Sequence, residues 1–223
     1  MISTLPSSYR PPALAHPEVL YIDDHLIIVN KPAGLLSVPG RGEDKKDCLL
    51  SRIQLNYPEA LTVHRLDMVT SGIMLFARSK QIHAALSKLF EHREIKKEYT
   101  AIVDGIITNP NGKIDLPLIT DWPNRPKQKV DFESGKASLT HYTVLSIDSS
   151  QLMTRLKLEP VTGRSHQLRV HLLSIGHVII GDELYAEPKI AEKSSRLLLH
   201  ANRLAFTHPE TDLVLDIECK APF

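Results

Sequence analysis

The stretch HRLDMVTSG (residues 64–72) runs directly into the apolar segment IMLFA (residues 73–77). An unbroken apolar run of this length, bounded by polar and small residues, is typical of a strand buried on both faces. The polar stretch carries one carboxylate, Asp67, with an arginine two residues before it and hydroxyls after it. A loop that ends on a buried strand has a rigid support, which a reacting group needs. We therefore expect residues 64–77 to mark both the core of a sheet and a candidate catalytic site.

The segments around this stretch predict more strands than helices. Strands are expected at residues 26–29, 73–77, 97–103, 140–147 and 153–158, and helices at 48–56, 80–92 and 165–175. Asp47, Ser79 and Ser165 are the expected start signals of these helices, and Gly176 is the expected stop of the last one. Several strands are neighbours in sequence. The expected fold class is therefore α+β, with a mixed, largely antiparallel central sheet flanked by helices.

Length and composition limit the class of protein. With 223 residues, 42% hydrophobic and 24% charged, the chain can form one substantial globular domain. Its apolar runs are far shorter than the ~20 residues of a membrane span, and its first residues lack a signal-peptide pattern. We therefore expect a cytoplasmic protein with no membrane association. The proline-rich residues 1–18 are expected to form an irregular N-terminal arm before a single domain over residues 19–223.

The balance of charge says little about a nucleic-acid partner. The net charge is only +1, so a polyanion would have to be held by a local basic surface. Arg125, Lys127 and Lys129 form one candidate, which we expect to lie in a single loop. An ordinary solvated face explains such a group equally well.

The 11 histidines raise the question of a metal site. The chain contains no H-E-x-x-H motif and no paired cysteine spacing. His166 and His171 are five residues apart, which is not the spacing that brings two ligands onto one helix face. We therefore expect no metal site.

Several segments together resemble the RluA family of pseudouridine synthases. HRLDMVTSG resembles the stretch that carries the family's catalytic aspartate, which corresponds to Asp67 here. The other similar segments are NKPAGL (30–35), KEYTA (97–101), TGRSHQLRVH (162–171), GD (181–182) and LHA (199–201). The match covers about residues 19–220, and residues 121–130 resemble the family's dual-specificity members, which act on rRNA and tRNA. The resemblance implies the pseudouridine synthase fold over residues 19–223, with the active-site cleft across the sheet and no S4-like RNA-binding domain.

The resemblance also implies the reaction. Such an enzyme breaks the N1–C1′ bond of a uridine, turns the uracil and rejoins it through C5. Because the reaction involves no net oxidation or hydrolysis, no cofactor is expected. A single carboxylate suits an isomerase, since glycosidases usually need a second acid. Asp67 would either attack the sugar carbon or remove a sugar proton.

By the same resemblance, Arg169 and Tyr99 join Asp67 in the catalytic set. Arg169 would keep Asp67 ionised, because a nearby positive charge favours a carboxylate. Tyr99 would lie against the target base, and is a candidate for removing the C5 proton. Arg65 would fill the space that the base leaves when it flips out of its stack. The full expected set of RNA-binding residues is Arg65, Arg164, His166, Arg125, Lys127 and Lys129.

The predicted function is therefore an isomerase that converts loop uridines to pseudouridine. The expected substrates are 23S rRNA and the tRNA anticodon stem-loop, and the expected form is a monomer. Two alternatives stay open. One is a family member that modifies a single RNA or another site. The other is a non-catalytic RNA-binding or RNA-remodelling module, in which Arg65 and the basic loops matter and Asp67 does not.

Overall fold

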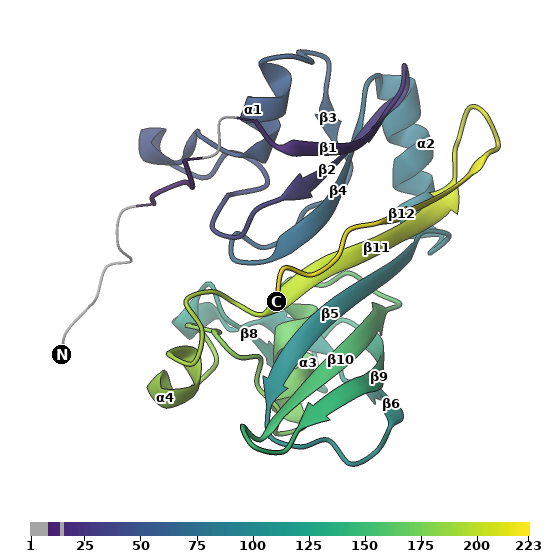
Figure 1. Cartoon of the computed structure of the whole chain (residues 1–223). Coiled ribbons are helices and arrows are strands. Elements are labelled where there is room, and N and C mark those ends of the chain that lie inside the picture. Colours follow the sequence, from purple (N-terminus) through teal and green to yellow (C-terminus); the bar gives the residue numbers. More distant parts are fainter. Residues whose placement is uncertain (1–8, 14–15) are drawn as a thin grey trace.

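A computed structural model describes residues 9–13 and 16–223, and within them the centre of the fold is a ten-stranded sheet (Figure 1). Its order is β1-β2-β4-β11-β5-β10-β9-β6, with β12 added to β11 and β3 added to β4. The strands are β1 (Glu18–Ile22), β2 (Leu26–Lys31), β3 (Leu61–Thr62), β4 (Ser71–Ala77), β5 (Lys96–Asp104), β6 (Asn111–Asp115), β9 (Leu139–Asp148), β10 (Met153–Pro160), β11 (Leu199–Thr207) and β12 (Val214–Glu218). The pairing of β4 with β11 is parallel and the other pairings between these strands are antiparallel. The predicted α+β class is confirmed.

The remaining elements flank this sheet. The helices are α1 (Leu49–Gln54), α2 (Lys80–Glu91), α3 (Gln167–Ser174) and α4 (Pro188–Ala191), with short 3-10 turns at Glu43–Lys45 and Trp122–Asn124. Strands β7 (Leu118–Thr120) and β8 (Gln128–Val130) pair as a separate hairpin. Within the described residues, no helix combines the length and the apolar character that crossing a bilayer requires.

Strands β2 and β4 are buried on both faces, which explains their unbroken apolar sequences. Leu26 and Ile28 face the core cluster that contains residues of α2, whereas Ile27 and Val29 face the cluster that contains residues of α1. Every residue of β4 is buried. Figure 1 shows α1 and α2 flanking these strands, and we call this part of the molecule the α1/α2 half.

A third core cluster lies in the other part, which we call the α3 half. Leu168 and Leu172 of α3 pack there with residues of β5 and β10, such as Ala101 and Leu156. Strands β11 and β5 run between the two halves (Figure 1). The loop before β4 and the start of α3 therefore meet at this junction, although they are far apart in sequence.

The parallel pairing of β4 with β11 depends on a glycine. Ser71 pairs with His200 and Gly72 with Ala201. Gly72 has φ +116, and a Cβ at this position would lie 2.3 Å from the carbonyl oxygen of Ala201. Only glycine combines this backbone conformation with such a close approach. The loop at residues 64–70 is thereby anchored at its end to the centre of the sheet.

The predicted strands are confirmed, but the helix starts are confirmed only in part. Ser79 caps α2 as predicted and accepts a hydrogen bond from the backbone N–H of Ile82. The prediction that Asp47 caps the first helix is wrong, because Cys48 is its N-cap and the Asp47 carboxylate accepts from Arg52 at 2.7 Å instead.

The start of α3 also differs from the prediction. Ser165 is not its N-cap; that position is taken by His166, whose φ of +53 is left-handed. The helix ends at Ser174, and Gly176 follows with φ +83, as expected for a residue that ends a helix.

The predicted irregular arm lies partly outside the described residues, since residues 1–8 and 14–15 are not among them. Residues 9–13 and 16–17 form no helix or strand. The Tyr9 hydroxyl donates to the Asp47 carbonyl at 2.9 Å and accepts from the Leu36 backbone N–H at 3.0 Å. Tyr9 therefore ties the arm to the α1/α2 half.

Candidate active site

The loop that carries Asp67 is fixed by hydrogen bonds on both sides of the aspartate. His64 Nε2 accepts from the backbone N–H of Leu75 in β4 at 3.0 Å. Burial, helped by the charge of Lys97, lowers the pKa of His64 to about 3, so the imidazole stays neutral and can accept. The Ser37 hydroxyl donates to the Leu66 carbonyl at 2.6 Å and accepts from the Leu66 N–H at 3.1 Å.

A buried lysine holds the next part of the same loop. Lys31 Nζ donates to the carbonyls of Pro32, Leu35 and Met68, at 2.9, 2.7 and 3.0 Å. The backbone N–H of Gly34 donates to the same Met68 carbonyl at 2.8 Å. Burial lowers the pKa of Lys31 to about 7, while the nearby Asp67 charge opposes this shift. Residues 30–35 therefore shape the loop immediately after Asp67.

The Asp67 carboxylate lies beside a buried arginine. Arg169 Nη1 is 3.5 Å from Asp67 Oδ2. Arg169 is itself held by Asp182, through Nε to Oδ2 at 2.7 Å and Nη2 to Oδ1 at 2.6 Å. Burial disfavours its charged form, but the Asp182 hydrogen bonds and the charges of Asp182 and Asp67 outweigh burial and raise the pKa of Arg169. The arginine is thus a permanent positive charge with a fixed orientation.

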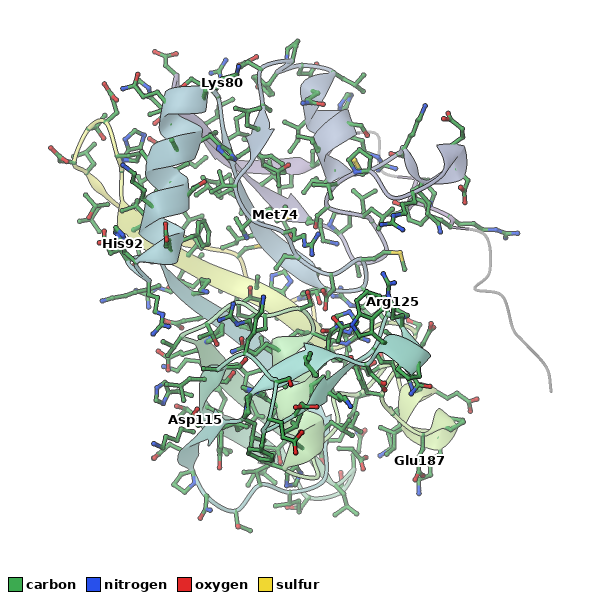
Figure 2. The ribbon with its side chains drawn as sticks, turned by 180° about the vertical axis from the view of Figure 1, so that it is seen from behind. Met74, Lys80, His92, Asp115, Arg125 and Glu187 are labelled. Atoms are coloured by element: carbon green, nitrogen blue, oxygen red, sulfur yellow. The ribbon has the colours of Figure 1, made fainter. Side chains whose placement is uncertain are left out.

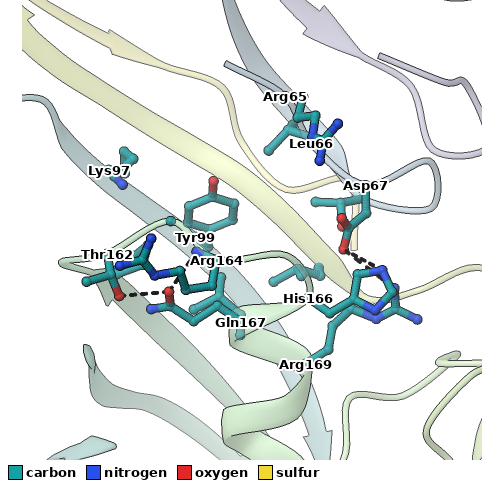
Figure 3. A pocket seen from close by; sticks show the side chains of 15 residues that line it. Arg65, Leu66, Asp67, Lys97, Tyr99, Thr162, Arg164, His166, Gln167 and Arg169 are labelled. Carbon is teal, nitrogen blue, oxygen red and sulfur yellow. Dashed lines mark hydrogen bonds and ion pairs between the residues drawn. The ribbon is translucent and has the colours of Figure 1, made fainter. Parts of the chain in front are cut away.

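Six predicted site residues line one pocket of about 520 Å³ (Figure 3). They are Asp67, Tyr99, Arg169, Arg65, Arg164 and His166. Asp67 and Arg65 come from the α1/α2 half, and Tyr99 comes from β5. The other three come from α3 and the segment immediately before it.

Tyr99 presents its ring to this pocket. Burial, together with the negative charge of Asp67, raises the pKa of Tyr99 well above its ordinary value. The hydroxyl therefore stays protonated at neutral pH. Lys97, two residues earlier on β5, also lines the pocket and was not among the predicted site residues.

The basic group Arg125, Lys127 and Lys129 is separate from the lining of this pocket, as far as the described residues show. Arg125 stacks over Trp122 at 4.4 Å in the turn of the β7–β8 hairpin, and Figure 2 shows it near the boundary between the two halves. The expectation of a single loop is wrong for Lys129, which lies on β8 and is 3.7 Å from Asp131. Strand pairing with β7 makes this segment a hairpin.

The sequence analysis did not predict that His166 would contact both Asp67 and Tyr185. His166 Nε2 is 3.9 Å from Asp67 Oδ2, and His166 Nδ1 is 2.7 Å from the Tyr185 hydroxyl. Burial is the main cause that raises the pKa of Tyr185 to about 12. The GD segment pointed to Asp182, but no sequence signal pointed to Tyr185. Among the described residues, no group of three or more His, Cys, Asp or Glu side chains could hold a metal ion.

A mostly antiparallel sheet that brings a lone aspartate, an arginine and a tyrosine to one pocket fits the class of enzyme that the sequence resembles. Residues 25–174 match the family model described as RNA pseudouridylate synthase. The chain belongs to this family and is an RNA pseudouridine synthase. The family prediction is confirmed, and it favours an enzyme over a non-catalytic RNA-binding module.

The chain is similar over nearly its whole length to individual members of the family. The chain is 52% identical over 205 residues to the dual-specificity RNA pseudouridine synthase RluA of Yersinia pestis, covering 92% of this chain and 99% of that protein. It is 49% identical over 216 residues to RluA of Escherichia coli K12, covering 97% and 98%. Among solved structures, it is similar to human RNA Pseudouridylate Synthase Domain Containing 1, with a TM-score of 0.79, 26% identity and coverage of 96% and 87%.

Proposed function

We propose that this enzyme converts loop uridines to pseudouridine in both 23S rRNA and the tRNA anticodon stem-loop. Support comes from relatives that are about half identical over nearly their whole length and carry the words dual-specificity RNA pseudouridine synthase in their name. A uridine in a loop is the cheaper target, since its base is already partly unstacked. The enzyme would act in the cytoplasm. A monomer would suffice, because the pocket is built within one chain.

Asp67 is the proposed reacting carboxylate. The observation that carries this assignment is the pairing of Asp67 with Arg169, whose guanidinium is locked by Asp182 and cannot turn away. A fixed positive charge at 3.5 Å attracts the carboxylate and holds it at the pocket that the target base would enter. An ionised carboxylate can attack the sugar carbon or accept a sugar proton.

Tyr99 and Arg65 would handle the base. The raised pKa of Tyr99 keeps its hydroxyl protonated, which favours the ring as a stacking surface over the phenolate as a base. Arg65 is exposed at the edge of the pocket and lies two residues before Asp67 (Figure 3). From there its side chain could enter the space that a flipped uridine vacates.

The proposal is tested with an Asp67→Asn variant on two stem-loops, one from 23S rRNA and one from a tRNA anticodon arm. The amide keeps the shape of the side chain but cannot act as a carboxylate. We expect loss of product on both RNAs, measured as tritium released from uracil C5, with RNA affinity within about threefold of wild type because RNA affinity comes chiefly from phosphate contacts. Asp24→Asn, at an exposed position outside the pocket, is the matched control.

Two outcomes would contradict different parts of this proposal. Substantial turnover by the Asp67→Asn variant would exclude Asp67 as the reacting group. Product on one stem-loop alone with the wild-type enzyme would favour the alternative of a family member with a single RNA substrate.

A further inference from the structure

The first turn of α3 directs two side chains at the same oxygen of Asp67. Arg169 Nη1 lies 3.5 Å and His166 Nε2 lies 3.9 Å from Oδ2. Residues three apart on a helix are neighbours on its surface, so one element places both groups. Among the described residues, no protein group donates a hydrogen bond to Asp67 Oδ1. The shortest contacts of the carboxylate with both groups are thus made by the same oxygen, Oδ2.

The position of His166 has a conformational cost. Its φ of +53 is left-handed, a conformation that residues other than glycine adopt rarely, although asparagine, aspartate and histidine do so more than most. Strained backbone of this kind persists where the surrounding structure fixes it, and it is concentrated at functional sites. In this conformation the His166 side chain lines the pocket and is only 12% exposed.

The Tyr185 hydroxyl is placed to select which nitrogen of neutral His166 carries the proton. The Tyr185 hydroxyl lies 2.7 Å from Nδ1 and accepts a hydrogen bond from the Gln128 backbone N–H at 2.8 Å. With the amide proton already donated to its oxygen, the hydroxyl is free to donate its own proton to Nδ1. When the hydroxyl donates in this way, neutral His166 carries its proton on Nε2, the nitrogen that faces Asp67.

One short turn supports both groups that face the carboxylate. Asp182 binds Arg169 and also accepts from the backbone N–H groups of Leu184 and Tyr185 at 3.0 and 3.2 Å. The Arg169 guanidinium lies over the Tyr185 ring, 5.0 Å from its centroid. The turn at residues 182–185 therefore fixes Arg169 through a carboxylate and His166 through a hydroxyl.

We propose that His166, held as the Nε2–H tautomer by Tyr185, is a positioning residue for Asp67. The separation of 3.9 Å exceeds a direct hydrogen bond, so the contact is open in the free enzyme and would close when uridine displaces water. Donors from His166 and Arg169 would then both engage Oδ2 and turn Oδ1 toward the sugar. This inference rests on the proposed role of Asp67 as the reacting group.

Three variants test the inference. Tyr185→Phe keeps the ring under Arg169 but removes the hydroxyl. His166→Asn removes the imidazole with a residue that tolerates a left-handed backbone. Tyr21→Phe is the control, because it removes a tyrosine hydroxyl that donates to Asp23 away from the pocket. Single-turnover rate and RNA affinity are measured with one stem-loop, and the tautomer of His166 is read from its 15N NMR shifts in the free protein.

We expect Tyr185→Phe and His166→Asn each to lower the single-turnover rate at saturating RNA at least tenfold, and Tyr185→Phe to leave RNA affinity within about twofold of wild type. The double variant should be no slower than His166→Asn alone, because both changes break one unit. His166 should be the Nε2–H tautomer in wild type and in Tyr21→Phe, and a mixture of tautomers in Tyr185→Phe.

The inference is overturned by a wild-type rate in either single variant, by multiplicative losses in the double variant, or by an unchanged His166 tautomer in Tyr185→Phe. The failure of the proposed function looks different. In that case the Asp67→Asn enzyme turns over, whereas the tautomer of the free protein still responds to Tyr185.

Discussion

At the scale of single residues, the pocket is organised by pairs in which one side chain fixes another. Asp182 is buried and binds two nitrogens of the Arg169 guanidinium, Nε and Nη2. The third nitrogen, Nη1, lies nearest to Asp67. The Asp67 carboxylate, in contrast, is partly open to the pocket. One guanidinium can serve both carboxylates because Asp182, the supporting acid, is buried, whereas Asp67, the proposed reacting acid, is accessible. Removing the buried partner would leave an uncompensated charge, which is strongly destabilising.

Arg65 differs from these residues because its expected partner is the RNA. Its side chain is exposed, and it borders the pocket two residues before Asp67. Arg65→Ala should therefore weaken capture of the flipped base and leave the fold intact. We expect at least a tenfold loss of kcat/KM on a stem-loop, with a free energy of unfolding within about 0.5 kcal/mol of wild type, as for surface substitutions. Arg41→Ala, at an exposed position outside the pocket lining, is the matched control. Unchanged kcat/KM in Arg65→Ala would remove this residue from the site.

At the scale of elements, the β4–β11 pairing decides whether the two halves form one site. Gly72→Ala would place a Cβ 2.3 Å from the Ala201 carbonyl oxygen at φ +116, so the strands must separate. We expect a loss of roughly 3 kcal/mol or more in the free energy of unfolding, combining the backbone term with lost pairing. Urea denaturation of the purified variant measures it.

Gly176→Ala is the matched control for this prediction. Gly176 also has a positive φ, +83, but a Cβ there meets nothing within 4 Å. Only the backbone term of about 1–2 kcal/mol should appear. Equal losses for the two variants would mean that the close approach of β4 to β11 contributes little.

The β7–β8 hairpin is the element that would bind the RNA backbone. Arg125, Lys127 and Lys129 lie outside the pocket lining, which suits phosphate contacts better than contacts with the base. Replacing all three with glutamine should lower the slope of log Kd against log salt by about 2–3 ion equivalents. The rate at saturating RNA should stay near that of wild type. An unchanged slope would exclude this hairpin from the RNA interface.

Periodicity predicted β2, β4, β5, β9 and β10 and helices α1–α3, but two of the three expected helix caps were wrong. The apolar run at 73–77 and the alternation at 97–103 are properties of the local sequence, so the strands followed from it directly. Cys48 and His166 are poor cap formers by general preference, yet Cys48 completes a local capping box with Ser51 and His166 takes the N-cap position without a side-chain cap hydrogen bond. Asp47 and Ser165 have better intrinsic preferences, yet Asp47 is bound by Arg52.

At the scale of the whole molecule, the site could be predicted only through its motifs. Asp67 and Arg169 are 102 residues apart, and nothing in either segment alone says that they meet. The family motifs predicted that Asp67, Tyr99 and Arg169 share a site, and the fold places all three in the lining of one pocket. Tyr185 lies outside those motifs, so its contact with His166 depends on the path of the chain after Asp182 and could not be predicted from the sequence.

The same packing that builds the site makes the whole fold sensitive to mild acid. Burial lowers the pKa of His64 to about 3 and is the main cause that lowers the pKa of His200 to about 4, whereas an unfolded histidine titrates near about 6.5. Between about pH 4 and 6.5 the unfolded chain therefore binds more protons than the folded one, so stability falls as pH falls. Each histidine should contribute a loss of up to about 1.4 kcal/mol per pH unit in this window. Aspartates with lowered pKa values, such as Asp23 and Asp47, lose their contribution only at lower pH.

Urea denaturation at pH 7.5, 6.0, 5.0 and 4.5 measures this dependence, and His64→Gln assigns it. Glutamine does not titrate, and its side-chain oxygen can still accept the Leu75 N–H that His64 Nε2 accepts. Between pH 6.0 and 4.5, we expect the slope of unfolding free energy against pH to be smaller in His64→Gln by about 1.4 kcal/mol per pH unit. This difference corresponds to one proton fewer taken up on unfolding. His92→Gln, at an exposed position, should keep the wild-type slope. An unchanged slope in His64→Gln would mean that His64 titrates normally in the folded protein. The proposed role of neutral His64 as the acceptor that anchors the Asp67 loop to β4 would then be wrong.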